Sequence, residues 1–239
     1  MTITHKHKTL RETLREVKFL SRMWFFVKKF RCYKPHRQIR NVKTIERGNY
    51  CCSFSFVPEI LSSKPIVYSF GVGFDVSFDL ALIHEFGAEV YAFDPTPKSL
   101  EWVQKNVNDN NFHLYPIGIS FRNGSEKFYI SGGLGTTMQK NQASSYITVQ
   151  MKTLSTIMHE LGHDYIDILK IDIEGTEFAV IPEILASRVK FGQLSIEVHN
   201  RFYSDGNAKI KDLIAQLNNA GFYIVSVSPN YEELTFVRK

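Results

Sequence analysis

The chain has 239 residues, of which 44% are hydrophobic and 22% are charged, and its net charge is +5. This length is enough for one large α/β domain with a substantial core and an additional segment. Its three cysteines, two of them adjacent, form neither a disulfide framework nor a zinc-binding spacing. The composition therefore argues against a disulfide-stapled secreted domain and favours a cytoplasmic protein.

Positive charge is concentrated at the start of the chain. Up to residue 47 there are fourteen Lys and Arg residues against three acids, a net charge of +11, so the remainder carries −6. Apolar residues recur at steps of three and four from Leu10 to Phe30, which predicts an amphipathic helix with a cationic face. We expect residues 1–47 to form a basic helical arm and residues 48–239 to form the main domain.

From residue 64 onward, strand-like and helix-like patterns alternate, as is typical of a parallel sheet covered by helices. Sheet strands are predicted at residues 66–70, 90–93, 112–117, 166–171, 193–198, 222–227 and 234–238. Helices are predicted at residues 76–85, 97–106, 154–161, 177–186 and 208–220. The last two strands are expected to form an antiparallel hairpin, and an insertion before the fourth sheet strand contains strands at residues 126–130 and 147–152.

The first predicted strand runs into a glycine turn, Gly71-Val72-Gly73-Phe74-Asp75, and the next strand ends in Asp94. Glycines let the backbone approach a ligand closely, and an acid after the neighbouring strand can accept hydrogen bonds from a ribose. A dinucleotide motif would place a third glycine where Val76 stands, and Asp75 would repel a pyrophosphate. The carboxylate suits the sulfonium and ammonium groups of S-adenosylmethionine, so this cofactor is favoured over a nicotinamide cofactor.

Three segments together resemble the FkbM-type methyltransferases: residues 68–79, 92–97 and 169–177, the last reading Leu-Lys-Ile-Asp-Ile-Glu-Gly-Thr-Glu. The resemblance implies a class I, Rossmann-like fold with a seven-stranded, mostly parallel sheet. It also implies S-adenosylmethionine-dependent O-methylation, most often of sugars or polyketide hydroxyls. Many members carry an acid two residues before the first glycine, where this chain has Ser69, and we expect Asp75 to supply part of that polar role.

Ligands of open α/β sheets bind at the carboxyl ends of the strands. We therefore expect cofactor contacts from the residues at these ends: Phe70, Gly71, Gly73, Asp75, Asp94, Pro95, Gly118, Ile119, Ser120 and Asp172.

Acid and imidazole groups follow the fourth and fifth predicted strands: Asp172, Glu174, Glu197 and His199. An alcohol becomes a good nucleophile when a general base removes its proton or a divalent cation lowers its pKa. These four residues are the candidate catalytic groups, and Asp172, Glu197 and His199 are candidate ligands of a divalent metal. Glu177 is interpreted as an acid that complements the start of a helix.

Three functions fit the sequence. The leading hypothesis is O-methylation of a hydroxyl on a sugar, polysaccharide or glycolipid. The alternatives are a nucleic-acid methyltransferase that uses the basic arm, and an inactive membrane-associated protein that keeps the fold. Nucleic acid is the less favoured partner, because no Asn/Asp-Pro-Pro-Tyr/Phe motif follows the fourth strand. Through residues 8–34 the arm is expected to contact an anionic membrane surface, at the inner face of a membrane.

Overall fold

The computed structural model describes residues 33–49, 52–131, 134–136 and 145–239. The chain divides into two compact units, Met1–Lys34 and Pro35–Lys239. The amphipathic helix expected between residues 10 and 30 lies outside the described residues. Within those residues, no helix is long and apolar enough to cross a membrane.

The second unit starts earlier than the expected boundary between residues 47 and 48. Strand β1 (Ile45–Arg47) pairs antiparallel with β2 (Phe54–Phe56). Upstream of β1, the backbone N–H of Gln38 donates to the carbonyl oxygen of Ile224 at 2.7 Å. Because these contacts are made with strands of the main domain, residues 35–47 belong to that domain and not to the arm.

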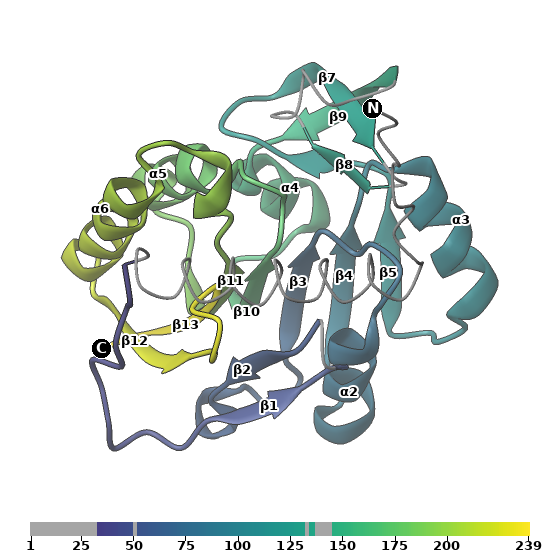
Figure 1. The fold of residues 1–239 in the computed structure, drawn as a ribbon. Coiled ribbons are helices and arrows are strands. Elements are labelled where there is room, and N and C mark those ends of the chain that lie inside the picture. Colours follow the sequence, from purple (N-terminus) through teal and green to yellow (C-terminus); the bar gives the residue numbers. More distant parts are fainter. Residues whose placement is uncertain (1–32, 50–51, 132–133, 137–144) are drawn as a thin grey trace, which may run out of the picture. The chain divides into compact units, whose positions relative to one another are not determined.

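A seven-stranded sheet forms the centre of the domain, in the order β12-β13-β11-β10-β3-β4-β5 (Figure 1). Neighbouring strands from β11 to β5 are parallel, and β13 is antiparallel to both β11 and β12. The expected class I methyltransferase fold with an antiparallel C-terminal hairpin is confirmed. The strands are β3 (Ile66–Phe70), β4 (Glu89–Phe93), β5 (Phe112–Tyr115), β10 (Ile166–Ile171), β11 (Phe191–Glu197), β12 (Phe222–Val227) and β13 (Glu233–Arg238).

Burial explains why these segments form central strands. Every residue of β10 is buried, as are the last four residues of β3, so both faces of the sheet are covered. The connecting helices are α2 (Ser77–Phe86), α3 (Pro97–Asn106), α4 (Leu154–Leu161), α5 (Glu177–Ser187) and α6 (Gly206–Asn219). Short 3-10 turns occur at Pro58–Ile60 (η1) and Asn200–Phe202 (η2).

The insertion forms a second sheet in the order β6-β9-β7-β8, above the upper ends of β3 and β4 in Figure 1. Its strands are β6 (Gly118–Ile119), β7 (Gly124–Ser131), β8 (Leu134–Thr136) and β9 (Ser145–Lys152). The strand predicted to extend to residue 117 instead ends at Tyr115. Pro116 follows it and has no backbone N–H for the ladder, and Gly118 then pairs with Met151 of β9.

Candidate active site

A cavity of about 470 Å3 lies where strands β3, β4, β10 and β11 end. Nine of the ten expected cofactor residues line it: Phe70, Gly71, Gly73, Asp75, Asp94, Pro95, Gly118, Ile119 and Asp172. The tenth, Ser120, is buried, and its hydroxyl donates to Glu126 at 3.2 Å. Phe128 and Met151 of the insertion also line the cavity. These two residues were not anticipated from the sequence, although their strands were.

Two glycines allow the cavity wall to form. Gly71 has a φ of +80°, and a Cβ atom there would overlap the carbonyl oxygen of Asp172. At Gly118 a Cβ atom would lie 2.5 Å from the sulfur of Met151. At Gly71 the overlap is with backbone, so close packing requires glycine, whereas at Gly118 the flexible end of the Met151 side chain would have to move.

Asp94 is 5% exposed and holds the glycine loop in place. Its Oδ2 accepts hydrogen bonds from the backbone N–H groups of Val72 and Gly73, at 3.1 and 3.0 Å. Its Oδ1 accepts from the N–H of Thr96 at 2.8 Å. The acid expected to contact a ribose therefore also organises the loop around that site.

Asp75 joins the loop to helix α2. Its Oδ1 accepts from the N–H of Ser77 at 2.7 Å, and its Oδ2 accepts from the side-chain amide of Asn49 at 2.8 Å. Burial acts to raise the pKa of Asp75, but hydrogen bonds from Ser77 and Asn49 outweigh it and hold the pKa below its usual value. Asp75 thus stays ionised at the edge of the cavity.

Beneath the loop, a lysine supports the backbone near the buried Ser69. Lys170 donates from Nζ to the carbonyl oxygen of Gly71 at 2.6 Å. Burial raises the pKa of Asp79 of α2, and the charge of Lys170 opposes this rise. Neither residue was recognised from the sequence as part of the site.

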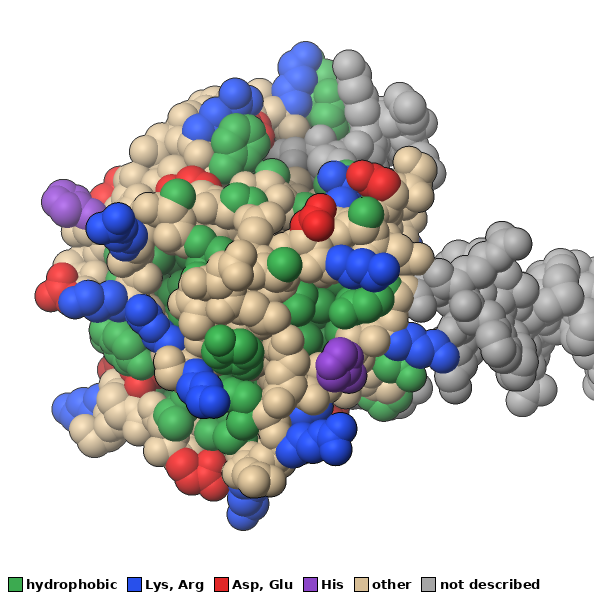
Figure 2. All heavy atoms as spheres, turned by 90° about the vertical axis from the view of Figure 1, so that its left-hand side faces the viewer, with side chains coloured by type: hydrophobic (Ala, Val, Ile, Leu, Met, Phe, Trp, Pro, Cys, Tyr) green, Lys and Arg blue, Asp and Glu red, His purple; other side chains and the backbone are tan. Residues whose placement is uncertain are grey.

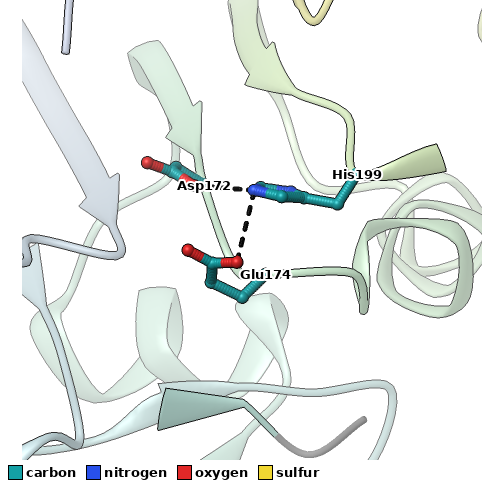
Figure 3. A group of neighbouring side chains, drawn as sticks. All are labelled: Asp172, Glu174 and His199. Atoms are coloured by element: carbon teal, nitrogen blue, oxygen red, sulfur yellow. Dashed lines mark ion pairs between the residues drawn. The ribbon is translucent and has the colours of Figure 1, made fainter. Parts of the chain in front are cut away.

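The four candidate catalytic residues meet at one point, and Figure 3 shows three of them, Asp172, Glu174 and His199. His199, which follows β11, is 1% exposed. Its Nε2 faces one carboxylate oxygen each of Asp172, Glu174 and Glu197, at 3.7, 3.6 and 3.4 Å respectively. The expected convergence of the two strand ends is therefore present, and Asp172, Glu174 and Glu197 also line the cavity.

Glu177 has a larger role than that of a helix-start acid. It is completely buried, and its Oε1 lies 2.7 Å from Nδ1 of His199 and accepts from the N–H of Gly175 at 3.0 Å. The hydroxyl of Tyr203 donates to the carbonyl oxygen of Gly175 at 2.6 Å. Glu177 therefore fixes the orientation of the imidazole, as a carboxylate partner does in many histidine sites.

The surroundings raise the pKa values of all four cluster residues, so these residues hold protons more tightly than free side chains do. Burial lowers the pKa of His199, but the hydrogen bond and charge of Glu177, with Glu197 and Asp172, raise it to about 9. Burial and the charge of Asp172 raise the pKa of Glu197 to about 8, against the effect of His199. Burial also raises the pKa values of Asp172 and Glu174.

The three side chains best placed to bind a metal differ by one residue from the three expected ligands, Asp172, Glu197 and His199. One ligand atom each of Asp172, Glu174 and His199 lies within 4.8 Å of the others. Glu174, with a φ of +52°, takes the place expected for Glu197 in this group.

Comparison with known proteins identifies the family. The Methyltransferase FkbM domain matches residues 66–224. The chain belongs to the FkbM methyltransferase family. This family member is 26% identical over 149 residues to the human probable methyltransferase-like protein 24, covering 61% of this chain and 36% of that protein. It is 27% identical over 113 residues to the 2-O-methyltransferase NoeI of Sinorhizobium fredii, covering 39% and 46% respectively.

This chain therefore spans between a third and a half of the length of these two relatives. Solved structures with a similar fold include the fibrillarin pre-rRNA processing protein of Methanococcus jannaschii, with a TM-score of 0.48 and 12% identity over 77% of this chain and 70% of that one. Human methyltransferase-like protein 13 in complex with SAH has a TM-score of 0.47 and 14% identity over 76% and 75%.

Proposed function

We propose that this chain is an S-adenosylmethionine-dependent O-methyltransferase that acts on a hydroxyl of a sugar, polysaccharide or glycolipid. One observation carries the proposal: Asp172, Glu174 and Glu197 line the same cavity as the glycine loop. Membership of the FkbM methyltransferase family supports a methyl donor. The relative NoeI is named a 2-O-methyltransferase, which supports oxygen as the methyl acceptor.

The chemistry of the cavity wall fits the cofactor. Gly71 and Gly118 bring backbone without a side chain against the cavity. Asp94 and the ionised Asp75 suit a ribose and an ammonium group, and the apolar Ile119 suits an adenine ring. When bound, S-adenosylmethionine supplies an electrophilic methyl carbon, whose bond to sulfur breaks as its bond to the acceptor oxygen forms, leaving S-adenosylhomocysteine.

The carboxylate cluster takes up the proton of the acceptor hydroxyl. Alcohols react slowly until a positioned base removes this proton, and a base is most effective when its pKa lies near the working pH. Burial raises the pKa values of Asp172 and Glu197 toward that range. Glu177 orients His199, whose positive charge offsets the carboxylates around it.

The acidic lining of the cavity favours a neutral hydroxyl at the acceptor position. Five acidic side chains line the cavity, among them the ionised Asp75, and their oxygens suit hydrogen bonds with sugar hydroxyls better than contact with the phosphates of a nucleic acid. On the face that carries α5 and α6, Lys and Arg side chains of the described residues are interspersed with acidic and apolar ones (Figure 2). RNA is the alternative acceptor, because residues 1–47 carry a net charge of +11 that suits contacts with phosphates.

A transfer assay with labelled S-adenosylmethionine tests the proposal. Sugar nucleotides, lipid-linked glycans and RNA are offered in parallel, with S-adenosylmethionine affinity measured by calorimetry. We expect label on a glycan hydroxyl. Label on RNA alone would favour the alternative, and absence of cofactor binding would contradict both enzymatic functions and favour the inactive interaction protein.

We also propose that residues 8–34 bring the enzyme to an anionic membrane surface at the cytoplasmic face. The support is the sequence pattern, in which an apolar stripe lies opposite Lys and Arg residues that each contribute about 1 kcal/mol near such a surface. In a flotation assay the full chain should float with vesicles containing phosphatidylserine, and a chain starting at Pro35 should not. Equal flotation of both chains would contradict this attachment.

A further inference from the structure

We propose that Asp172, Glu174 and Nε2 of His199 bind one divalent first-row transition-metal cation, of the type of Mn2+, at the edge of the cavity. Figure 3 shows the two carboxylates and the imidazole directed toward one another from the ends of β10 and β11. The inference deepens the proposed function and rests on it for the role of the ion, but the binding site itself follows from the geometry of the three side chains.

The spacing of Nε2 of His199 from each of the two carboxylates matches a shared ion. Nε2 of His199 is 3.7 Å from Oδ1 of Asp172 and 3.6 Å from Oε2 of Glu174. Two atoms that each lie about 2.1 Å from one ion are about 3.0 Å apart at an angle of roughly 90°, and about 3.4–3.6 Å apart at roughly 110–120°. A direct hydrogen bond between an imidazolium and a carboxylate would be about 2.7–2.9 Å. The observed separations are too long for that bond and suit a cation between the groups.

The buried imidazole provides an independent indication of a ligand. Within the described part of the chain, the hydrogen bond of the His199 ring is made at Nδ1, with Glu177. Nε2 belongs to a side chain that is 1% exposed, and it faces oxygens of Asp172, Glu174 and Glu197 at 3.7, 3.6 and 3.4 Å, each longer than an ordinary hydrogen bond between charged groups. Metal-binding histidines characteristically donate their second ring N–H to a carboxylate, which leaves the other nitrogen free to bind the ion. Glu177 occupies that position.

The donor set indicates which ions are suited. Two carboxylate oxygens and one imidazole nitrogen form a mixed set, whereas Mg2+ and Ca2+ prefer oxygen alone. First-row transition metals bind imidazole nitrogen, and Mn2+ is the one among them that is best suited to carboxylate and hydroxyl oxygens. Three protein ligands leave room for the acceptor hydroxyl, because Asp172 and Glu174 face the cavity.

A cation at this position and the nearby Glu197 would have different roles in activating the acceptor hydroxyl. It would lower the pKa of a bound hydroxyl, as divalent ions do for bound water. Glu197 lies outside the three-residue group but has an oxygen 3.4 Å from Nε2 of His199 and lines the same cavity. With the cation bound, Glu197 would accept the hydroxyl proton, and the acceptor oxygen would form its bond to the methyl carbon as the methyl–sulfur bond breaks.

Binding is tested directly with Mn2+. The full chain is treated with EDTA, dialysed and titrated with MnCl2, and free Mn2+ is followed by electron paramagnetic resonance. We expect one site per chain, with at least tenfold weaker binding in Glu174→Gln and in His199→Asn. The matched control is Glu89→Gln, which removes a carboxylate that lies 2.8 Å from His113 outside the cluster. Circular dichroism and S-adenosylhomocysteine affinity establish that each variant is folded.

The outcomes separate this inference from the proposed function. Absence of Mn2+ binding, or equal binding by the wild type and Glu174→Gln, would overturn the inference. Methyl transfer that continues at its full rate in EDTA would overturn the activating role while leaving the proposed function intact. One-site binding that Glu174→Gln weakens would support the site even if none of the tested acceptors is methylated.

Discussion

Replacing Asp94 tests how the glycine loop recognises a ribose. The Asp94 carboxylate accepts three backbone N–H bonds, two of them from the loop residues Val72 and Gly73. Asp94→Ala removes all three bonds together with any bond to a ribose hydroxyl. In Asp94→Asn, the amide NH2 must face at least one of these donors, so at least one N–H loses its acceptor.

The expected loss follows from the strength of such bonds. Hydrogen bonds to a charged group contribute about 1.5–3 kcal/mol each. Loss of one bond to the ribose corresponds to about 10- to 150-fold weaker binding. A destabilised loop would add to this loss by reducing the population of the binding-competent conformation. We therefore expect Asp94→Ala to weaken S-adenosylmethionine binding by at least about tenfold.

Calorimetry with adenosine and with 2′,3′-dideoxyadenosine distinguishes the two contributions. If Asp94 contacts the ribose diol, Asp94→Ala should weaken binding of adenosine more than binding of the dideoxy ligand. If Asp94 only supports the loop, both ligands should lose affinity equally. Asp109→Ala is the control, because Asp109 also accepts from an N–H two residues ahead, that of Asn111, but lies outside the cavity. Unchanged affinity for both ligands in Asp94→Ala would refute both roles.

Three further changes have defined outcomes. Asp172→Asn should lower turnover by about 10²–10⁴-fold with little change in cofactor affinity, and calorimetry showing a large loss of affinity would contradict its catalytic assignment. Gly71→Ala should reduce cofactor binding and thermal stability together, because the added methyl group overlaps the carbonyl oxygen of Asp172. A melting temperature equal to that of the wild type would argue against this close packing of Gly71 on Asp172. In EDTA, His199 and Glu197 have folded-state pKa values raised to about 9 and about 8, so the folded chain retains protons that the unfolded chain releases. The stability that these retained protons contribute is fully present below the pKa values of the unfolded chain, and it is lost as the pH rises through the pKa values of the folded chain. Urea unfolding from pH 6.5 to 9 should therefore show stability falling by roughly 1.4 kcal/mol per pH unit for each retained proton, with a smaller slope in Glu197→Gln.

Strong periodic patterns made most of the fold predictable. The strands β3 and β10 match the predicted ones residue for residue, because both are buried on two faces and most of their side chains are apolar. The short strands β1, β6 and β8 were missed. A three-residue strand such as Ile45–Arg47 is defined by its pairing with a distant segment, and the local sequence contains little of that information.

Parallel topology also explains which site residues could be predicted. Asp172 follows β10 and His199 follows β11, and these strands are neighbours in the sheet. The carboxyl ends of adjacent parallel strands lie together, so convergence of the two side chains follows from strand order once the strands are placed. Oδ1 of Asp172 lies 3.7 Å from Nε2 of His199, close enough for the two side chains to act in one site.

The role of Glu177 could not be inferred by the same reasoning. An acid in the first turn of a helix has the same sequence signature whether it faces solvent or a buried imidazole, since both arrangements complement the helix dipole. Packing decides between them here, because Glu177 is completely buried and bonded to His199. A buried carboxylate without a partner would cost several kcal/mol, so Glu177 and His199 require each other. The helix start that follows Asp172 and Glu174 therefore completes the site, and the apparently structural acid determines which ring nitrogen faces the cluster.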